Sequence, residues 1–345
     1  MDSALVQKAA EKFGSGVENI EQLSGGLIHF SYKVDFTAGK SIVLQNINTN
    51  TFREPQNLIE NHHTLYQFLQ EHSASISIPE PLLTITGEKS HTDDWGNFWR
   101  ATHFRSDCFS RNDPGNVDSA RETAGTFAAF TYTFKSLPVE SLLPVIPGFH
   151  DLEWRYQQLE EAALKADSDR LKETEGLRKE LKDRKELVHL YTEIKTSEKY
   201  HLRIHHHDCK ISNILFDKIT SQPSCIVDLD TTMPGYIFSD VGDMIRTMAC
   251  SRNEEACDFE TVFVRKEIFD AILEGYLSEM ENDLSDKETE VVRKSGLIMI
   301  YMQALRFLTD YLNDDVYYQI KYPKHNLNRA INQFYLLKSM ENLLK

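Results

Sequence analysis

The sequence has few cysteines, no long apolar run and no excess of positive charge. Its five cysteines are scattered and form no C-x-x-C pair, which is typical of a cytosolic protein with reduced thiols. The longest apolar stretch lies near residues 296–305 and is broken by Gln303. That stretch is too short to span a bilayer. The first residues also lack the basic and apolar regions of a signal peptide, so we expect a cytoplasmic protein.

The balance of charge excludes further classes of partner. A formal net charge of −15 argues against a broad nucleic-acid surface, which would have to be basic. It also gives no reason to expect an anionic membrane as a partner. With 41% apolar and 26% charged residues, the 345-residue chain has the composition of a globular protein that could hold two lobes.

The most informative stretch is residues 206–213, which read H-H-D-C-K-I-S-N. Phosphoryl transfer from a nucleotide needs a carboxylate that orients the acceptor hydroxyl and takes its proton, and oxygen ligands that hold Mg²⁺ against the phosphates. Asp208 suits the first role, and Asn213 with Asp228 suits the second. Asp208 and Asn213 are five positions apart, so one tight loop can turn both toward the same place.

A second carboxylate follows Asp228 closely. Residues 226–230 read I-V-D-L-D, and the alternation of an extended strand predicts Asp228 and Asp230 on one face, with Val227 and Leu229 toward the core. Asp230 is therefore a further candidate metal ligand. Any one of these residues alone would more often close a turn or lie in solvent. The ordered set, with an apolar run at 214–216, favours phosphotransfer.

These motifs resemble the catalytic loop and metal-binding strand of protein kinase-like phosphotransferases, in the branch of aminoglycoside and choline kinases. The resemblance implies an α+β, bilobal fold that uses ATP and Mg²⁺. In that fold a small N-terminal lobe has an antiparallel sheet and one main helix, and a larger C-terminal lobe is mostly helical. We place the lobes at residues 1–104 and 105–345.

The spacing of apolar residues predicts the elements of these lobes. We expect two strands joined through a glycine turn within residues 23–34, a third strand at 41–45, and two further strands at 82–86 and 98–104. Helices are expected at 55–72, 119–134, 260–282, 286–313 and 328–344, with two more inside 151–199.

The expected nucleotide loop contains Gly25 and Gly26, whose backbone could come close to phosphates. The strand that follows departs from other kinases, which place a lysine where this chain has Gln45. An amide can donate a hydrogen bond but brings no charge. Lys210 is therefore our candidate for the positive charge on the γ-phosphate, and a solvated surface lysine is the alternative.

Three consecutive histidines, His205, His206 and His207, raise the possibility of a metal site. Adjacent residues do not converge on one ion without a contorted backbone, so we expect no transition metal there. The resemblance implies instead that His206 braces the catalytic loop. It also implies that Asp240 anchors the same loop through hydrogen bonds to its backbone.

A narrower resemblance concerns the acceptor. Residues 228–235 (DLDTTMPG) and 240–246 (DVGDMIR), with 44–52, 306–312 and 316–329, are similar to the corresponding blocks of N-acetylhexosamine 1-kinases. This similarity covers nearly the whole chain, and Gln45 is expected within that group.

The narrower resemblance implies an ATP-dependent sugar kinase. The acceptor would be the anomeric hydroxyl of N-acetylglucosamine or N-acetylgalactosamine, and the product a sugar 1-phosphate. Arg306, Tyr317 and His29 would then contact the substrate. His29 and His207 both stand where that group has asparagine. For Arg306 the alternative is a structural salt bridge, for example to Asp310.

Two other functions fit the same motifs. A kinase of another small alcohol, such as a different sugar, an aminoglycoside or a choline-like amine, would keep the loop and the metal ligands but change residues 300–330. An inactive nucleotide- or sugar-binding protein would keep the fold alone. The missing strand lysine favours this last alternative, whereas the intact Asp208, Asn213 and Asp228 argue against it.

Overall fold

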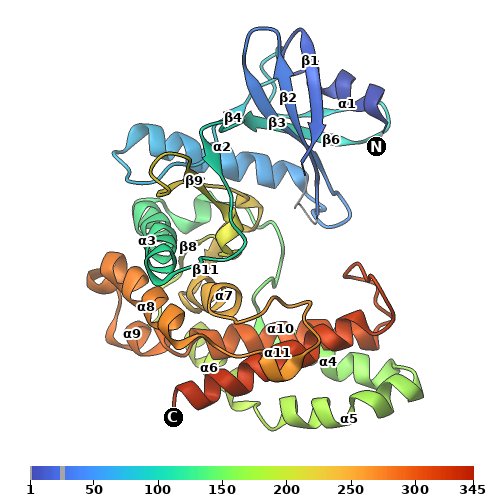
Figure 1. Cartoon of the computed structure of the whole chain (residues 1–345), viewed down its shortest axis with the longest axis vertical. Coiled ribbons are helices and arrows are strands. Elements are labelled where there is room, and N and C mark those ends of the chain that lie inside the picture. Colours follow the sequence, from blue (N-terminus) through green and yellow to red (C-terminus); the bar gives the residue numbers. More distant parts are fainter. Residues whose placement is uncertain (1, 24–27) are drawn as a thin grey trace. The chain divides into compact units, whose positions relative to one another are not determined.

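The computed structural model describes residues 2–23 and 28–345 (Figure 1). The chain forms two compact units that interleave along the sequence. The first unit comprises Met1–Ser110, Thr133–Pro147 and Ile214–Met233, and the second comprises Arg111–Tyr132, Gly148–Asn213 and Pro234–Lys345. The division into lobes at residues 1–104 and 105–345 stays a prediction.

The first unit contains an antiparallel sheet in the order β1-β2-β3-β6-β4, and β5 also pairs with β6. The strands are β1 (Val17–Gln22), β2 (Phe30–Phe36), β3 (Ser41–Ile47), β4 (Pro81–Leu82), β5 (His91–Thr92) and β6 (Phe98–His103). Two helices, α1 (Ser3–Ala10) and α2 (Pro55–Glu71), belong to the same unit. A smaller sheet has the order β10-β9-β7, formed by β7 (Cys108–Phe109), β9 (Ile214–Asp217) and β10 (Pro223–Ile226).

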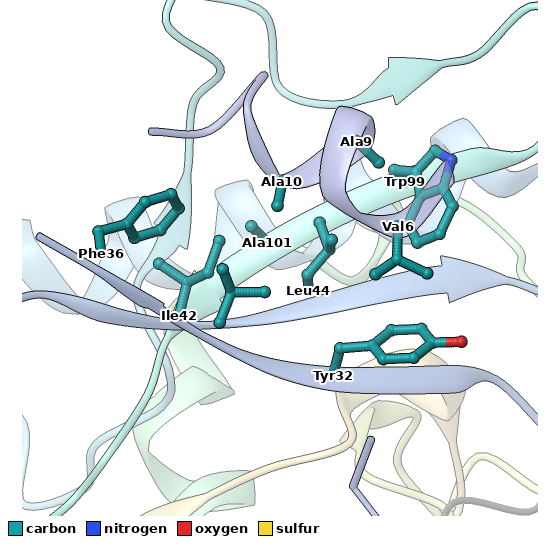
Figure 2. Packing of buried hydrophobic residues seen from close by; sticks show 10 residues of the cluster. Val6, Ala9, Ala10, Tyr32, Phe36, Ile42, Leu44, Trp99 and Ala101 are labelled. Atoms are coloured by element: carbon teal, nitrogen blue, oxygen red, sulfur yellow. The ribbon is translucent and has the colours of Figure 1, made fainter. Parts of the chain in front are cut away.

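One face of the larger sheet forms the core of this unit. Alternate residues of β2, β3 and β6 are buried together with three residues of α1. These are Tyr32, Val34, Phe36, Ile42, Leu44, Trp99 and Ala101 of the sheet and Val6, Ala9 and Ala10 of the helix. Figure 2 shows the α1 side chains lying among those of the sheet. The period-two pattern buries one face of β2 and β3, whereas β6 is buried on both faces from Phe98 to Thr102. The pattern in β2 and β3 fixes the register, because a slip of one residue would turn the apolar set outward.

That register also places polar residues in a row on the opposite face. Gln45 of β3 lies directly opposite Ser31 of β2 on one side and Arg100 of β6 on the other. Cross-strand neighbours have Cβ atoms about 4.5–5.5 Å apart. The three polar side chains are therefore within reach of one another.

The second unit is mostly helical. Its helices are α3 (Val117–Thr133), α4 (Leu152–Lys165), α5 (Ser168–Lys182), α6 (Glu186–Thr196), α7 (Phe238–Met248), α8 (Lys266–Met280), α9 (Asp286–Val292), α10 (Ser295–Leu312) and α11 (His325–Leu343). Helix α10 is buried along most of its length and packs against α4, α7 and α11. Two short strands, β8 (Arg203–His205) and β11 (Met233–Gly235), pair beside this bundle.

The predicted α+β class is confirmed, with an antiparallel sheet in the N-terminal part and a helical C-terminal part. The number of helices differs in two places. Residues 151–199 hold three helices rather than two, because the side chain of Asp167 caps a new helix start. The helix expected at 286–313 is two helices, the first opened by a capping box at Ser285.

No helix within residues 2–23 and 28–345 combines the length and the apolar character that crossing a membrane requires.

The contact between α7 and α10 depends on a glycine. A Cβ added at Gly242 would lie 2.5 Å from the backbone oxygen of Ser295 and 2.7 Å from Cβ of Met299. Backbone atoms cannot move aside as a flexible side chain can. The two helices can therefore approach this closely only without a side chain at position 242.

We expect Gly242→Ala to lower the free energy of unfolding by about 1–3 kcal/mol, as overpacking of a buried contact does. Gly176→Ala is the matched control, since Gly176 lies in the exposed interior of α5 with nothing within 4 Å of an added Cβ. That change should raise stability by roughly 0.5–1 kcal/mol. Urea unfolding measures both, and an undiminished stability for Gly242→Ala would contradict the close contact.

Candidate active site

The predicted catalytic loop is a tight turn that brings Asp208, Lys210 and Asn213 together in the second unit. The side-chain nitrogen of Asn213 donates to the backbone oxygen of Asp208 at 2.8 Å and to its Oδ2 at 2.9 Å. Lys210 Nζ lies 2.8 Å from the same Oδ2. A short 3₁₀ turn, η3 (Ile211–Asn213), closes the loop immediately before β9. The spacing of five residues therefore forms one loop, as the sequence predicts.

Both donors fall on one oxygen of Asp208. Within the described residues no hydrogen bond reaches Oδ1, and the side chain is partly accessible. Burial alone would raise the pKa of Asp208, but the charge of Lys210 and the hydrogen bonds from Lys210 and Asn213 lower it. The carboxylate is therefore ionised at neutral pH, with one oxygen available to accept a proton.

The orientation of Asn213 suits it to a metal ion. Its amide nitrogen is held by Asp208, which directs the amide oxygen away from that residue. An amide oxygen is a hard ligand of the type that Mg²⁺ binds. Across residues 2–23 and 28–345, no group of three or more His, Cys, Asp or Glu side chains could hold a metal ion. A magnesium site here would therefore have to take further oxygens from nucleotide phosphates.

The backbone of this loop is tied to Asp240, in the first turn of α7. Asp240 Oδ1 accepts the N–H of His207 at 2.8 Å, and Oδ2 accepts the N–H of His206 at 3.1 Å. His205 Nδ1 lies 3.1 Å from the same Oδ2. Burial would raise the pKa of Asp240, but the neighbouring histidines lower it far more. The start of a helix also favours a negative charge.

The three histidines point to different partners. His205 faces Asp240, while the ring of His206 packs edge-on against Phe127 at 5.3 Å between centroids, and its Nδ1 accepts the N–H of Asp208 at 3.3 Å. His207 Nδ1 lies 2.7 Å from the hydroxyl of Ser239. These directions diverge, as expected for adjacent residues.

His207 has a left-handed backbone and belongs to a small buried cluster with His150 and Ser239. Its φ is 65°, and its ring lies so close to Gly235 that a Cβ there would be 2.4 Å away. His207 Nδ1 and His150 Nδ1 are 3.2 Å apart, and both contact Ser239 Oγ. Burial lowers the pKa of His150 well below its ordinary value, and His207 lowers it further. His150 is therefore neutral at physiological pH.

The expected strand arrangement of the two later carboxylates is wrong. Strand β10 ends at Ile226, and Asp228 is left-handed, with φ 62° and ψ 55°. A 3₁₀ turn, η4 (Leu229–Thr231), follows. The alternation of an extended strand stops at that point, so Asp228 is exposed whereas Asp230 is buried.

Asp230 forms a buried ion pair with Arg100. Arg100 donates from Nη1 to Oδ1 at 2.5 Å and from Nη2 to Oδ2 at 2.7 Å. His29 Nε2 lies 2.7 Å from the same Oδ2. Burial alone would raise the pKa of Asp230, but Arg100 and His29 lower it strongly. A metal ion at Asp230 would have to displace one of these donors.

Gln45 continues the same network. Its amide oxygen accepts Nε of Arg100 at 2.9 Å, and its amide nitrogen donates to Ser31 Oγ at 3.0 Å. Gln45 is thus joined to His29 and Asp230, two other residues that the sequence singles out. Gly25 and Gly26 lie outside the described residues.

Arg306, in α10, lies among aromatic rings. Its guanidinium is 5.1 Å from the ring centroid of Phe149 and 5.8 Å from that of Tyr318, and Nη1 donates to Gln303 at 3.1 Å. Tyr317 packs against Tyr318 at 4.8 Å between centroids and is 59% exposed.

Asp310, the salt-bridge partner that a purely structural Arg306 would have, is engaged elsewhere. It accepts the backbone N–H groups of Tyr317 and Tyr318 and the amide of Asn326.

The sequence reasoning missed three residues at these sites. Arg100 had a visible signal, since it is a charged residue in the middle of the apolar strand 98–104. A buried charge needs a partner, which could have prompted a search for one. Ser239 and His150 gave no comparable signal, because their contacts with His207 join segments far apart in the chain.

The sequence pattern of the phosphotransferase enzyme family matches residues 19–276, which is most of the chain. Several solved structures share the fold with 14–15% sequence identity. An aminoglycoside phosphotransferase from Alicyclobacillus acidocaldarius has a TM-score of 0.66 and 14% identity, covering 98% of this chain and 95% of its own.

Two further structures are kinases by name. A microcompartment-associated aminopropanol kinase has a TM-score of 0.69 and 14% identity, covering 99% of this chain and 98% of its own. The amicoumacin kinase hAmiN, solved with AMP-PNP, Ca²⁺ and its ligand, has a TM-score of 0.65 and 15% identity, covering 97% and 93%. At these identities the likeness concerns the fold, which is the kinase-like bilobal fold that the motifs predict.

We expect Asp240→Asn to destabilise the protein by about 3 kcal/mol, because it removes the charge from at least two hydrogen bonds of about 1.5–3 kcal/mol each. The pKa of Asp240 is lower in the folded state than its unfolded value of about 3.9. Its contribution is therefore full above that pH and is lost as the pH falls toward the folded pKa.

Urea unfolding of both proteins at several pH values tests this. The difference in unfolding free energy should be constant between about pH 5.5 and 7 and shrink below about pH 4. Asp118→Asn is the control, since Asp118 forms an exposed i,i+3 pair with Arg121, and pairs of that kind contribute under about 1 kcal/mol. A pH-independent difference would mean that the carboxylate charge is not what holds the loop.

Proposed function

Because the chain belongs to the phosphotransferase enzyme family, we propose that it transfers the γ-phosphoryl group of ATP to the anomeric hydroxyl of an N-acetylhexosamine. The observation that carries this proposal is the state of Asp208, which is ionised, fixed through one oxygen and able to accept a proton at the other. The sugar acceptor rests on the resemblance of residues 228–246 and 306–329 to N-acetylhexosamine 1-kinases.

In this reaction Asp208 acts as the general base. Its Oδ1 takes the proton of the anomeric hydroxyl as that oxygen forms a bond to the γ-phosphorus, and the bond from the γ-phosphorus to the β-bridging oxygen breaks. ADP leaves with the electron pair, and the sugar 1-phosphate remains. Lys210, 2.8 Å from the base, keeps it ionised and brings the positive charge that Gln45 does not.

Asn213 and Asp228 are the residues that would hold Mg²⁺. Both offer oxygen ligands, and magnesium is usually bound by one or two such side chains together with substrate phosphates. When bound, the ion neutralises the charge that develops on the phosphoryl group. Asn213 supports the assignment with its amide oxygen directed away from Asp208.

Arg306 is the proposed main contact to the sugar. A guanidinium has five N–H donors, and only Nη1 donates to a protein acceptor among the described residues. The rings of Phe149 and Tyr318 hold its plane in place. An exposed aromatic ring such as Tyr317 could cover the apolar face of a sugar. Hydroxyl groups need fixed donors of this kind, because they carry no charge to attract a partner at longer range.

A kinase of an amino alcohol is the second candidate. The names of three solved structures with this fold refer to an aminoglycoside, an aminopropanol and amicoumacin as ligands or substrates. The chain carries a net charge of −15, which would attract a cationic acceptor.

An ATP-consumption assay over a panel of acceptors tests the function. The panel should hold N-acetylglucosamine, N-acetylgalactosamine, their non-acetylated amines, glucose, aminopropanol, choline and an aminoglycoside. We expect turnover with the two N-acetylhexosamines and an acid-labile sugar 1-phosphate as product. Turnover with amines alone would select the second candidate, and no turnover at all would favour an inactive binding protein.

Asp208→Asn keeps the shape of the side chain but cannot take the proton. We expect kcat to fall by roughly 10²–10⁴-fold, the usual contribution of a positioned general base, while the KM for ATP changes little. Asp217→Asn, at the last residue of β9, is the control and should keep wild-type kcat. Near wild-type turnover by a folded Asp208→Asn variant would show that Asp208 is not the general base.

Arg306→Ala should raise the KM for the sugar at least tenfold and leave the KM for ATP within about twofold, since a hydrogen bond to a charged group contributes about 1.5–3 kcal/mol. Arg184→Ala is the matched control, because Arg184 lies at the same 5.1 Å from an aromatic ring, that of Phe334. Steady-state kinetics with both sugars, with thermal melting to exclude unfolding, decides the matter. A sugar KM that both variants leave unchanged would take Arg306 out of the acceptor site.

A further inference from the structure

Five polar residues form one continuous network in the first unit; counted as whole residues, Arg100 and Asp230 are buried and the other three are partly buried. The connections run from Ser31 to Gln45, from Gln45 to Arg100, from Arg100 to Asp230 and from Asp230 to His29. Three of the five lie directly opposite one another on β2, β3 and β6. The sheet therefore sets the position of Arg100, and Arg100 sets the position of Asp230.

The hydrogen bonds of His29 define its charge. The backbone N–H of Asn48 donates to His29 Nδ1 at 3.0 Å, so that nitrogen carries no proton. The proton is on Nε2, which donates to Asp230 at 2.7 Å. The imidazole is then neutral, and the charge of Asp230 is balanced by Arg100 alone.

Both oxygens of Asp230 are engaged in this network. Oδ1 accepts one guanidinium nitrogen of Arg100, and Oδ2 accepts the other together with the imidazole of His29. All three side chains are almost fully buried. A divalent ion at Asp230 would replace a well-formed bidentate pair and lie against a guanidinium of the same charge. Asp228, two residues earlier, is exposed.

A fixed Asp230 limits where Asp228 can be. Successive Cα atoms are 3.8 Å apart, so the two residues are joined by a tether of about 7 Å. Within that tether Asp228 has a left-handed backbone, a conformation that non-glycine residues hold only when their surroundings impose it. The 3₁₀ turn at Leu229–Thr231 follows at once.

We propose that Arg100 and Asp230 are positioning residues for phosphoryl transfer. Arg100 holds Asp230, which presents Asp228 to the metal–nucleotide complex, and Asp230 itself is not a metal ligand. The inference rests on the proposed phosphotransfer and assigns different tasks to the two carboxylates that the sequence groups as ligands. The guanidinium on β6 is bound to a carboxylate rather than offered to a phosphate.

The test compares Asp230→Asn, Arg100→Gln and the double variant in manganese binding. Mn²⁺ replaces Mg²⁺ as a probe, with AMP-PNP held constant and binding followed by calorimetry. We expect each single variant to weaken Mn²⁺ binding by about tenfold, because residues that orient a ligand typically contribute 10–100-fold. The double variant should bind Mn²⁺ no more weakly than the single variant with the lower affinity, because both changes disrupt the same pair. The kcat values should fall in parallel.

In the alternative, Asp230 is itself a metal ligand. This alternative predicts the opposite change in Mn²⁺ affinity for Arg100→Gln. Removing Arg100 would then free Oδ1 and leave Oδ2 with His29 alone. Arg100→Gln would therefore bind Mn²⁺ as well as or more tightly than wild type. That result, or losses that add in the double variant, would overturn the proposal. Asp228→Asn is the reference for a lost ligand and should weaken binding more than either positioning variant.

A second buried pair, whose two residues belong to the second unit, controls for general damage. Arg203 and Glu288 form a second bidentate pair, with Nη1 to Oε1 at 2.5 Å and Nη2 to Oε2 at 3.1 Å. Arg203→Gln should lower thermal stability to a degree similar to Arg100→Gln and leave Mn²⁺ binding unchanged. The double variant Arg100→Gln/Asp230→Asn leaves no unpaired charge and should fold where a single variant does not. If only the double variant folds, Mn²⁺ binding weakened by about tenfold supports the proposal, and wild-type affinity overturns it.

The binding measurement needs no acceptor. If the protein phosphorylates no hexosamine but binds Mn²⁺–nucleotide, the proposed acceptor is disproved. The same titrations still test the roles of Arg100 and Asp230. Wild-type protein that binds no Mn²⁺–nucleotide would instead disprove the phosphotransfer itself.

Discussion

Removing a carboxylate from water is unfavourable by several kcal/mol unless several donors meet it, and this constraint shapes both units of the protein. Asp240 is met by two backbone N–H groups and an imidazole. Asp230 is met by a guanidinium and an imidazole. Each carboxylate is stable only while its donors keep their positions. A buried carboxylate therefore restricts the positions of the groups that donate hydrogen bonds to it.

The two carboxylates hold different parts of the chain. Asp240 ties down the backbone that leads into Asp208, while Asp230 is joined to the sheet through Arg100. Asp208 differs from both, because its side chain is partly accessible and its donors all reach one oxygen. Asp208 thus keeps one oxygen without a hydrogen bond among the described residues, whereas both oxygens of Asp230 and Asp240 are engaged.

Local patterns carried much of the correct prediction. The spacing from Asp208 to Asn213 determines a turn within a few residues, so the loop could be predicted from the sequence. The alternating apolar residues of β2 and β3 likewise indicate strands with one buried face. In both cases the information lies within about ten residues of the feature that it predicts.

The errors arose where distant residues decide the conformation. Alternation predicts a strand through Asp230, but the chain becomes left-handed at Asp228 and turns. Asp230 in this turn binds Arg100, which is 130 residues away in sequence. The partnership of Gln45 with Arg100 depends on strand register, which no single strand shows. One further error is local: the helix expected at 286–313 is interrupted between α9, which ends at Val292, and α10, which begins at Ser295.

The glycine between α7 and α10 has a mechanical consequence. Because Gly242 has no side chain, the backbones of the two helices touch without a compliant layer between them. Asp240, which binds the backbone directly before Asp208, lies half a turn before Gly242. Arg306 lies eleven residues beyond Ser295, or about 16 Å along α10 at 1.5 Å per residue. A displacement of α10 along its axis would therefore meet α7 through a backbone contact close to Asp240, with no side chain at position 242 to absorb it.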